Sequence, residues 1–101
     1  MASYTVEITQ TGNNFNFDPG YLQVQHGDKV RFTCNQPFTV KFLDGTPFAK
    51  ASQFAKNAPA TTAYSTIDAA AALRPYHYAV SATDADGFIH MDAGCPTIEV
   101  V

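Results

Sequence analysis

The sequence has little positive charge, no tryptophan and no long apolar run. Only 6 of its 101 residues are lysine or arginine. These residues are scattered along the chain, so they form no stripe that could follow a nucleic-acid backbone. No stretch approaches the roughly 18 consecutive apolar residues of a membrane-spanning helix. We therefore expect neither a nucleic-acid partner nor a transmembrane segment.

Sequence signals of catalysis and of secretion are also missing. The chain has neither the glycine pattern of a nucleophile elbow nor that of a phosphate-binding loop. We expect a protein that is not an enzyme and that needs no cofactor. The first residues lack a basic stretch followed by an apolar core, which is the pattern of a signal peptide. Two interpretations of the compartment stay open: a cytoplasmic protein, or the mature form of an exported one.

The composition is that of a folded domain. Hydrophobic residues make up 46% of the chain, and the formal net charge is −3. A disordered chain would be less apolar and more strongly charged. A chain of this mass buries about two-thirds of its surface on folding, which allows one modest core. We expect a single domain over residues 1–101.

Apolar and polar residues alternate with a period of two in the first half and in the last quarter of the sequence. Val30, Phe32 and Cys34, for example, share one face of a strand, and Ile98 and Val100 share another. This period is typical of strands with one buried face. Short strands at regular spacing, separated by turn residues, indicate an all-β sandwich or barrel.

The middle segment, Thr46–Pro75, is rich in alanine and lacks this alternation. We expect a long crossover within the domain, with one or two helical turns over Asp68–Arg74. Phe48, Phe54 and Tyr64 are candidate anchors of this crossover. If these three side chains stay exposed together, they would form a partner-binding patch.

The sequence contains five short motifs: Phe15-x-Phe17-x-Pro19, Leu22-x-Val24, Gly27-Asp28-x-Val30-x-Phe32, Pro37-x-x-Val40-x-Phe42 and Tyr76-x-Tyr78. They resemble motifs of the cupredoxins, the blue-copper β-sandwich family. The resemblance covers residues 15–42 and 76–101, and it implies a Greek-key sandwich, to which the residues of the middle segment add the long, partly helical crossover.

The same resemblance implies that the copper ligands are missing. A blue-copper centre needs a thiolate, two imidazoles and usually an axial thioether. Phe38 stands at the position of the first histidine and Val80 at that of the cysteine, while Thr83 and Phe88 stand near the other two. Without the thiolate there is no soft charged donor for copper. We therefore predict a copper-free scaffold, with Phe38 and Phe88 filling its core.

The remaining soft donors leave two questions open. A copper or zinc protein with a relocated site would use His77, His90 and Cys95. Met91 cannot join His90 at one ion, because adjacent strand residues point to opposite faces. Cys34 and Cys95 are candidates for a disulfide, and the alternatives are a pair of metal ligands or two separate buried thiols.

These observations favour a non-enzymatic binding, interaction or structural module on a copper-free cupredoxin-like scaffold. The expected partner is another protein or a second copy of the chain. A lightly charged surface permits such packing, and the end strands of a sandwich offer edges for pairing. The alternative function is the relocated copper or zinc site.

Overall fold

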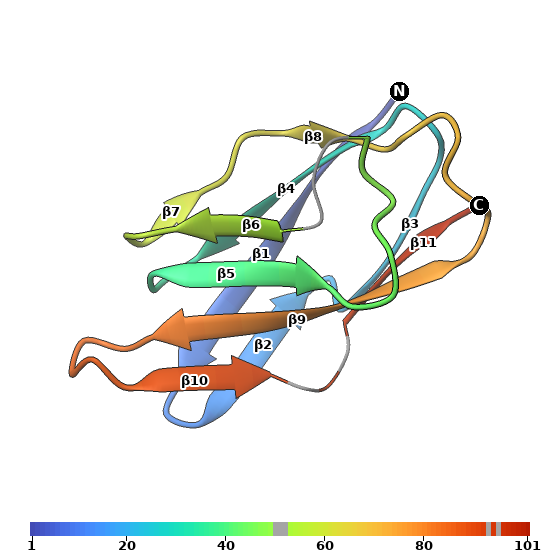
Figure 1. The fold of residues 1–101 in the computed structure, drawn as a ribbon. Coiled ribbons are helices and arrows are strands. Elements are labelled where there is room, and N and C mark those ends of the chain that lie inside the picture. Colours follow the sequence, from blue (N-terminus) through green and yellow to red (C-terminus); the bar gives the residue numbers. More distant parts are fainter. Residues whose placement is uncertain (50–52, 93, 95) are drawn as a thin grey trace.

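The computed structural model describes residues 1–49, 53–92, 94 and 96–101. Within these residues, eleven strands form two sheets that pack face to face (Figure 1). The strands are β1 (Ser3–Thr11), β2 (Asn14–Asp18), β3 (Tyr21–Val24), β4 (Lys29–Cys34), β5 (Phe38–Phe42), β6 (Gln53–Lys56), β7 (Ala60–Thr61), β8 (Ser65–Thr66), β9 (Pro75–Thr83), β10 (Ile89–Asp92) and β11 (Thr97–Val100).

Each sheet combines strands from distant parts of the sequence. The first sheet has the order β2-β1-β4-β7, and β8 also pairs with β4. The second has the order β3-β11-β9-β5-β6, and β10 also pairs with β9. The β1–β4 and β3–β11 pairs are parallel, and the other strand pairs are antiparallel. The predicted all-β sandwich is confirmed.

Alternate residues of both sheets build the core, as the period of two predicts. Val30, Phe32 and Cys34 of β4 are buried, and so are Tyr76 and Tyr78 of β9. An aromatic cluster lies at the centre, with neighbouring ring centroids 5.1 to 6.4 Å apart and most ring pairs edge to face. Its members are Phe32, Phe42, Phe48, Phe54 and Tyr78.

The crossover between β5 and β9 is long, but the prediction of helical turns over Asp68–Arg74 is wrong. The Asp68 carboxylate accepts a hydrogen bond from the backbone N–H of Ala70 at 3.0 Å. The Ala71 N–H donates to the Asp68 carbonyl oxygen, also at 3.0 Å. An aspartate that closes a turn in this way competes with helix formation, and so short a segment is too weak to nucleate a helix. In its place, the described part of the crossover contains β6, β7 and β8.

The described residues include no helix with the length and apolar character needed to span a membrane.

Tyr78 is fully buried, and its hydroxyl has no hydrogen-bond partner among the described residues. Burial raises the pKa of this hydroxyl above its ordinary value. Folding removes the hydrogen bonds that the Tyr78 hydroxyl makes to water, and no described residue replaces them. We therefore expect Tyr78→Phe to stabilise the fold by up to about 1–2 kcal/mol. Urea denaturation followed by circular dichroism would measure this change.

Tyr76→Phe is the matched control for this prediction. The Tyr76 hydroxyl donates to the carbonyl oxygen of Ala72 at 2.9 Å. Its removal should therefore cost about 1 kcal/mol. If Tyr78→Phe destabilises the protein as much as Tyr76→Phe does, the idea of an unsatisfied hydroxyl is refuted.

Candidate functional site

Phe38 and Val80, at the positions predicted for two copper ligands, lie on the paired strands β5 and β9, two residues apart in register, and both are apolar. In the antiparallel β5–β9 pair, Phe38 faces Ala82 and Val40 faces Val80. Phe38 is 3% exposed and Val80 is 1% exposed. These two side chains supply neither a thiolate nor an imidazole, so they fill the core where a metal would need donors.

Beyond Val80 the chain forms the β9–β10 hairpin, whose turn is organised by Asp84. One carboxylate oxygen of Asp84 accepts from the backbone N–H groups of Asp86 and Phe88 at 2.9 and 3.0 Å. The other oxygen lies 2.8 Å from Nε2 of His90. These hydrogen bonds, that of His90 first, hold the pKa of Asp84 below its ordinary value. Gly87 completes the turn at a φ of 86°, in the left-handed region that favours glycine.

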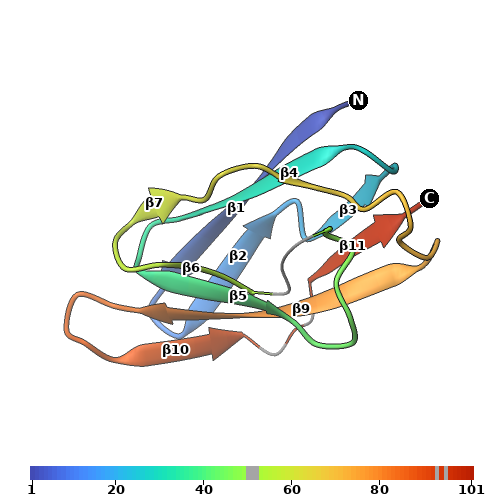
Figure 2. The same ribbon diagram turned by 45° about the horizontal axis from the view of Figure 1, so that its top comes forward.

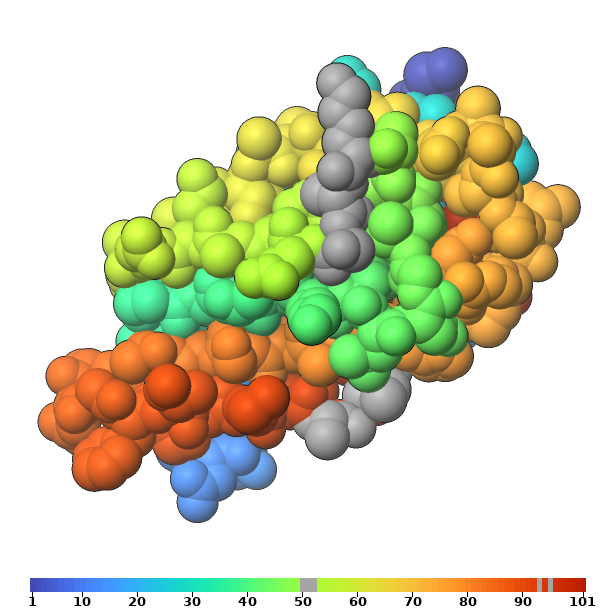
Figure 3. Space-filling model, in the orientation of Figure 1, coloured from blue at the N-terminus to red at the C-terminus, as the bar shows by residue number. Residues whose placement is uncertain are grey.

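The turn directs three apolar side chains into solvent. Phe88 is 67% exposed, Ile89 is 70% exposed and Met91 is 75% exposed. We call these three residues the hairpin patch. The prediction that Phe88 fills the core is wrong, because the Asp84 turn holds Phe88 just before β10, outside the sandwich. Figure 3 shows the atoms of this hairpin, in orange and red, at one end of the molecule beside β5.

A shallow groove of about 210 Å³ adjoins the hairpin patch on the outer face of the second sheet. The small residues Ala79 and Ser81 of β9 line it, and Leu43 and Met91 contribute larger apolar side chains. Ser81 lies opposite Met91 in the β9–β10 register. The other lining residues are Thr39, Lys41, Gln53 and Val80. Met91 thus belongs both to the hairpin patch and to the groove.

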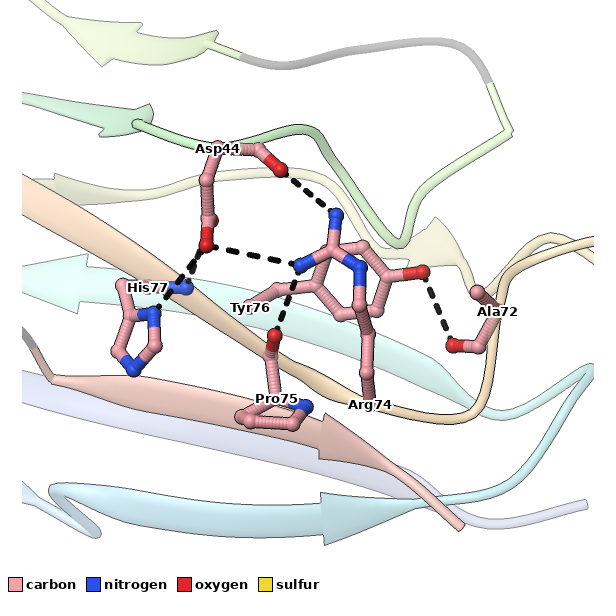
Figure 4. A network of polar contacts seen from close by, with 6 residues as sticks. All are labelled: Asp44, Ala72, Arg74, Pro75, Tyr76 and His77. Carbon is pink, nitrogen blue, oxygen red and sulfur yellow. Dashed lines mark hydrogen bonds and ion pairs between the residues drawn. The ribbon is translucent and has the colours of Figure 1, made fainter.

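A second cluster of polar groups connects the loop after β5 to the start of β9 (Figure 4). The Asp44 carboxylate accepts from the backbone N–H of His77 at 3.3 Å and lies 3.3 Å from His77 Nδ1. Arg74 Nη1 lies 3.6 Å from the same carboxylate, and the guanidinium stacks 3.9 Å from the ring centroid of Tyr76. Hydrogen bonding by His77, in the first place, lowers the pKa of Asp44. The cluster fixes the loop conformation.

Gly45 tests how tightly this loop is held. Its φ is 101°, and a Cβ added there would lie 2.9 Å from Nη2 of Arg74. We expect Gly45→Ala to destabilise the protein by about 1–3 kcal/mol, because alanine rarely adopts this φ. The measurement is urea denaturation of Gly45→Ala, Arg74→Ala and the double variant. A double variant as stable as Arg74→Ala alone would contradict the backbone-strain argument.

The structure separates the two histidines of the proposed relocated metal site. His77 contacts Asp44, whereas His90 contacts Asp84. His90 faces Ala82, five positions beyond His77 along β9, which corresponds to roughly 17 Å of strand. In the described ranges no group of three His, Cys, Asp or Glu side chains could hold a metal ion. Cys95, the third candidate, lies outside the described residues.

Cys34 is buried at the end of β4, and this burial raises the pKa of its thiol. Its candidate disulfide partner, Cys95, is not among the described residues, so the bridge stays a prediction.

Phe48, Phe54 and Tyr64 do not share one exposed surface. Phe48 is 3% exposed and belongs to the aromatic cluster, and Phe54 is half-buried against the core. Tyr64 is 43% exposed, with the Arg31 guanidinium 4.6 Å from its ring centroid. The hairpin patch was missed from the sequence, although the adjacent apolar pair Phe88-Ile89 is a signal, since consecutive strand residues point to opposite faces.

Comparison with known proteins shows similarity in structure alone. No family model and no curated protein matches the sequence. The pseudoazurin of Sinorhizobium meliloti is 22% identical, with a TM-score of 0.55 over 100% of this chain and 75% of that one. The pseudoazurin of Methylobacterium extorquens AM1 is 16% identical, with a TM-score of 0.53 over 97% of this chain and 74% of that one. The chain therefore has a cupredoxin-like β-sandwich fold, without a metal-binding group among its described residues.

Proposed function

We propose that the protein is a non-enzymatic protein-binding module on a copper-free cupredoxin-like scaffold, and that the hairpin patch with its groove is the contact surface. The exposure of Phe88, Ile89 and Met91 carries this proposal. Isolated exposed apolar residues are ordinary on protein surfaces. Ile89 and Met91, however, share one face of β10, and Met91 lines the groove, an arrangement that is typical of an interaction site. Burial of each such side chain by a partner contributes about 1.5–3 kcal/mol.

The rigidity of the hairpin supports the same function. The hydrogen bonds that Asp84 accepts from Asp86, Phe88 and His90 hold the turn in one conformation before a partner arrives. Prior ordering lowers the entropic cost of binding. Among the described residues that line the groove, Lys41 alone carries a full charge, so a partner would desolvate little charge there.

The test is affinity capture with the immobilised protein, with Phe88→Ser/Met91→Ser as the variant and Leu73→Ser as its control. Leu73 is 66% exposed and does not belong to the hairpin. Loss of two buried apolar side chains, each worth about 1.5 kcal/mol, corresponds to roughly a hundredfold loss of affinity. We expect proteins retained by the wild type and the control to be lost from the double variant. An unchanged capture profile would rule out this surface.

Native mass spectrometry with added copper or zinc tests the copper-free part of the proposal. We expect no stoichiometric adduct. A metal ion that is retained at one equivalent, and lost in His77→Ala, His90→Ala or Cys95→Ser, would instead support the relocated metal site.

A further inference from the structure

We infer that the hairpin patch binds a second copy of this chain, and that the two β10 strands pair antiparallel about a two-fold axis at Met91. This inference rests on the proposed function and names the partner. The axis would join the second sheets of two molecules, edge to edge, into one continuous sheet.

β10 is an edge strand with little protection against such pairing. In the described part of the chain, only β9 pairs with β10. Proteins commonly guard edges with lysine, proline or very short strands. Pro19 follows β2, Lys56 lies in β6, and β7 and β8 have two residues each. The other outer strand, β3, presents Tyr21 and Gln23, which both hydrogen-bond to Glu99. β10 has no lysine or proline and exposes apolar side chains.

The hairpin geometry shows which backbone groups are available. The Asp84 N–H donates to the Phe88 carbonyl oxygen at 2.9 Å, so these two residues form a hydrogen-bonded pair. Hydrogen-bonded and non-hydrogen-bonded pairs alternate along an antiparallel ladder. The backbone N–H and C=O groups of Ile89 and Met91 therefore point away from β9. Those of Met91 can form the two reciprocal hydrogen bonds of a new strand pair with Met91 of a second copy.

Symmetry and side-chain contacts select the register. A two-fold axis perpendicular to the sheet places residues of the same face opposite each other. One residue of β10 therefore lies opposite its own copy, and the axis passes between the two. An axis at His90 would set His90 against the same residue of the second copy. An axis at Met91 sets Met91 against Met91 and, twice, His90 against Asp92. The second arrangement keeps the two copies of His90 apart and sets the two Met91 side chains, each 75% exposed, against each other. Apolar cross-strand pairs are stabilising.

Sedimentation velocity of the full chain from 5 µM to 1 mM is the first test. Strands of four residues make a small interface, so we expect a weak dimer with a Kd of the order of micromolar. Met91→Lys places two lysines at the axis and should weaken the dimer at least tenfold. Leu73→Lys is the control and should leave the dimer intact. A monomeric wild type at 1 mM, or a dimer that survives Met91→Lys, would overturn the inference.

Disulfide cross-linking tests the register, with Cys95→Ser as the background. Residues at a hydrogen-bonded pair have Cα atoms about 5.5 Å apart, within the roughly 4.4–6.8 Å range of disulfides. Under mild oxidation Met91→Cys should give a covalent dimer, and Ile89→Cys should give much less. Equal cross-linking of the two variants would overturn the proposed register. A monomeric wild type whose capture of other proteins still needs Phe88 and Met91 would refute self-pairing while leaving the proposed function intact.

Discussion

Phe32→Ala should lower the free energy of unfolding by about 3–5 kcal/mol, the usual cost of removing a buried phenylalanine ring. The Phe32 side chain is 0% exposed. Its ring centroid lies 5.5 Å from that of Phe54 and 5.6 Å from that of Tyr78. These neighbours belong to strands of the opposite sheet, so the sheets would have to shift for the cavity to close. Small domains are stable by about 5–15 kcal/mol, so the variant would be largely unfolded in moderate urea.

Urea denaturation monitored by circular dichroism measures this effect. Phe32→Leu keeps most of the side-chain volume and should cost less than half as much. Phe88→Ala removes the same atoms from a ring that is 67% exposed, and should change stability by about 0.5 kcal/mol or less. Equal losses for Phe32→Ala and Phe88→Ala would contradict the assignment of Phe32 to the core and of Phe88 to the surface.

Asp28→Ala should cost about 2–4 kcal/mol, the second large effect. Asp28 is 5% exposed, and its two carboxylate oxygens accept hydrogen bonds at 2.9 Å from the backbone N–H groups of Ala2 and Gln25. Alanine would leave both donors unsatisfied, each at a cost of about 1–3 kcal/mol if water cannot replace the carboxylate. Thermal or urea denaturation at pH 7 checks the loss. The exposed Asp86, changed to Asn, provides the comparison.

The contribution of Asp28 should also depend on pH. The hydrogen bond from Ala2, and then that from Gln25, lowers the pKa of the folded carboxyl. Stability from a lowered pKa is fully present above the unfolded-state value of about 3.9 and is lost as the pH falls through the folded value. The gap in stability between wild type and Asp28→Asn should therefore be widest near pH 7 and shrink below about pH 4. A gap of constant size from pH 7 to pH 3 would contradict this explanation.

The sequence predicted the strands that face both water and core. Val30, Phe32 and Cys34 lie on one side of β4, and Tyr76 and Tyr78 lie on one side of β9. Such alternation indicates a sheet with one face in the core and the other face in solvent. The cupredoxin resemblance added the overall fold, which periodicity alone does not distinguish from other sandwiches.

The crossover and the hairpin patch could not be predicted in the same way. β7 and β8 are two-residue strands that exist through pairing with β4, and such short segments carry no periodic signal. Asp68 can start a helix or close a turn, and the structure shows the turn. The exposure of Phe88 depends on the hydrogen bond between its backbone N–H and the Asp84 carboxylate, which orders the hairpin. The alternation of apolar and polar residues carries no information about such a contact.

The position of β11 has a consequence for synthesis of the chain. β11 lies between β3 and β9 inside the second sheet (Figure 2). β3 leaves the ribosome early, yet its partner strand, at residues 97–100, emerges after the other described strands of the sandwich. Until then the second sheet is incomplete, and apolar side chains of the preceding strands stay exposed to solvent. Long-range pairing of this kind slows folding and lengthens the time during which apolar surface is exposed and can aggregate. The second sheet is therefore complete only after β11 has been synthesised.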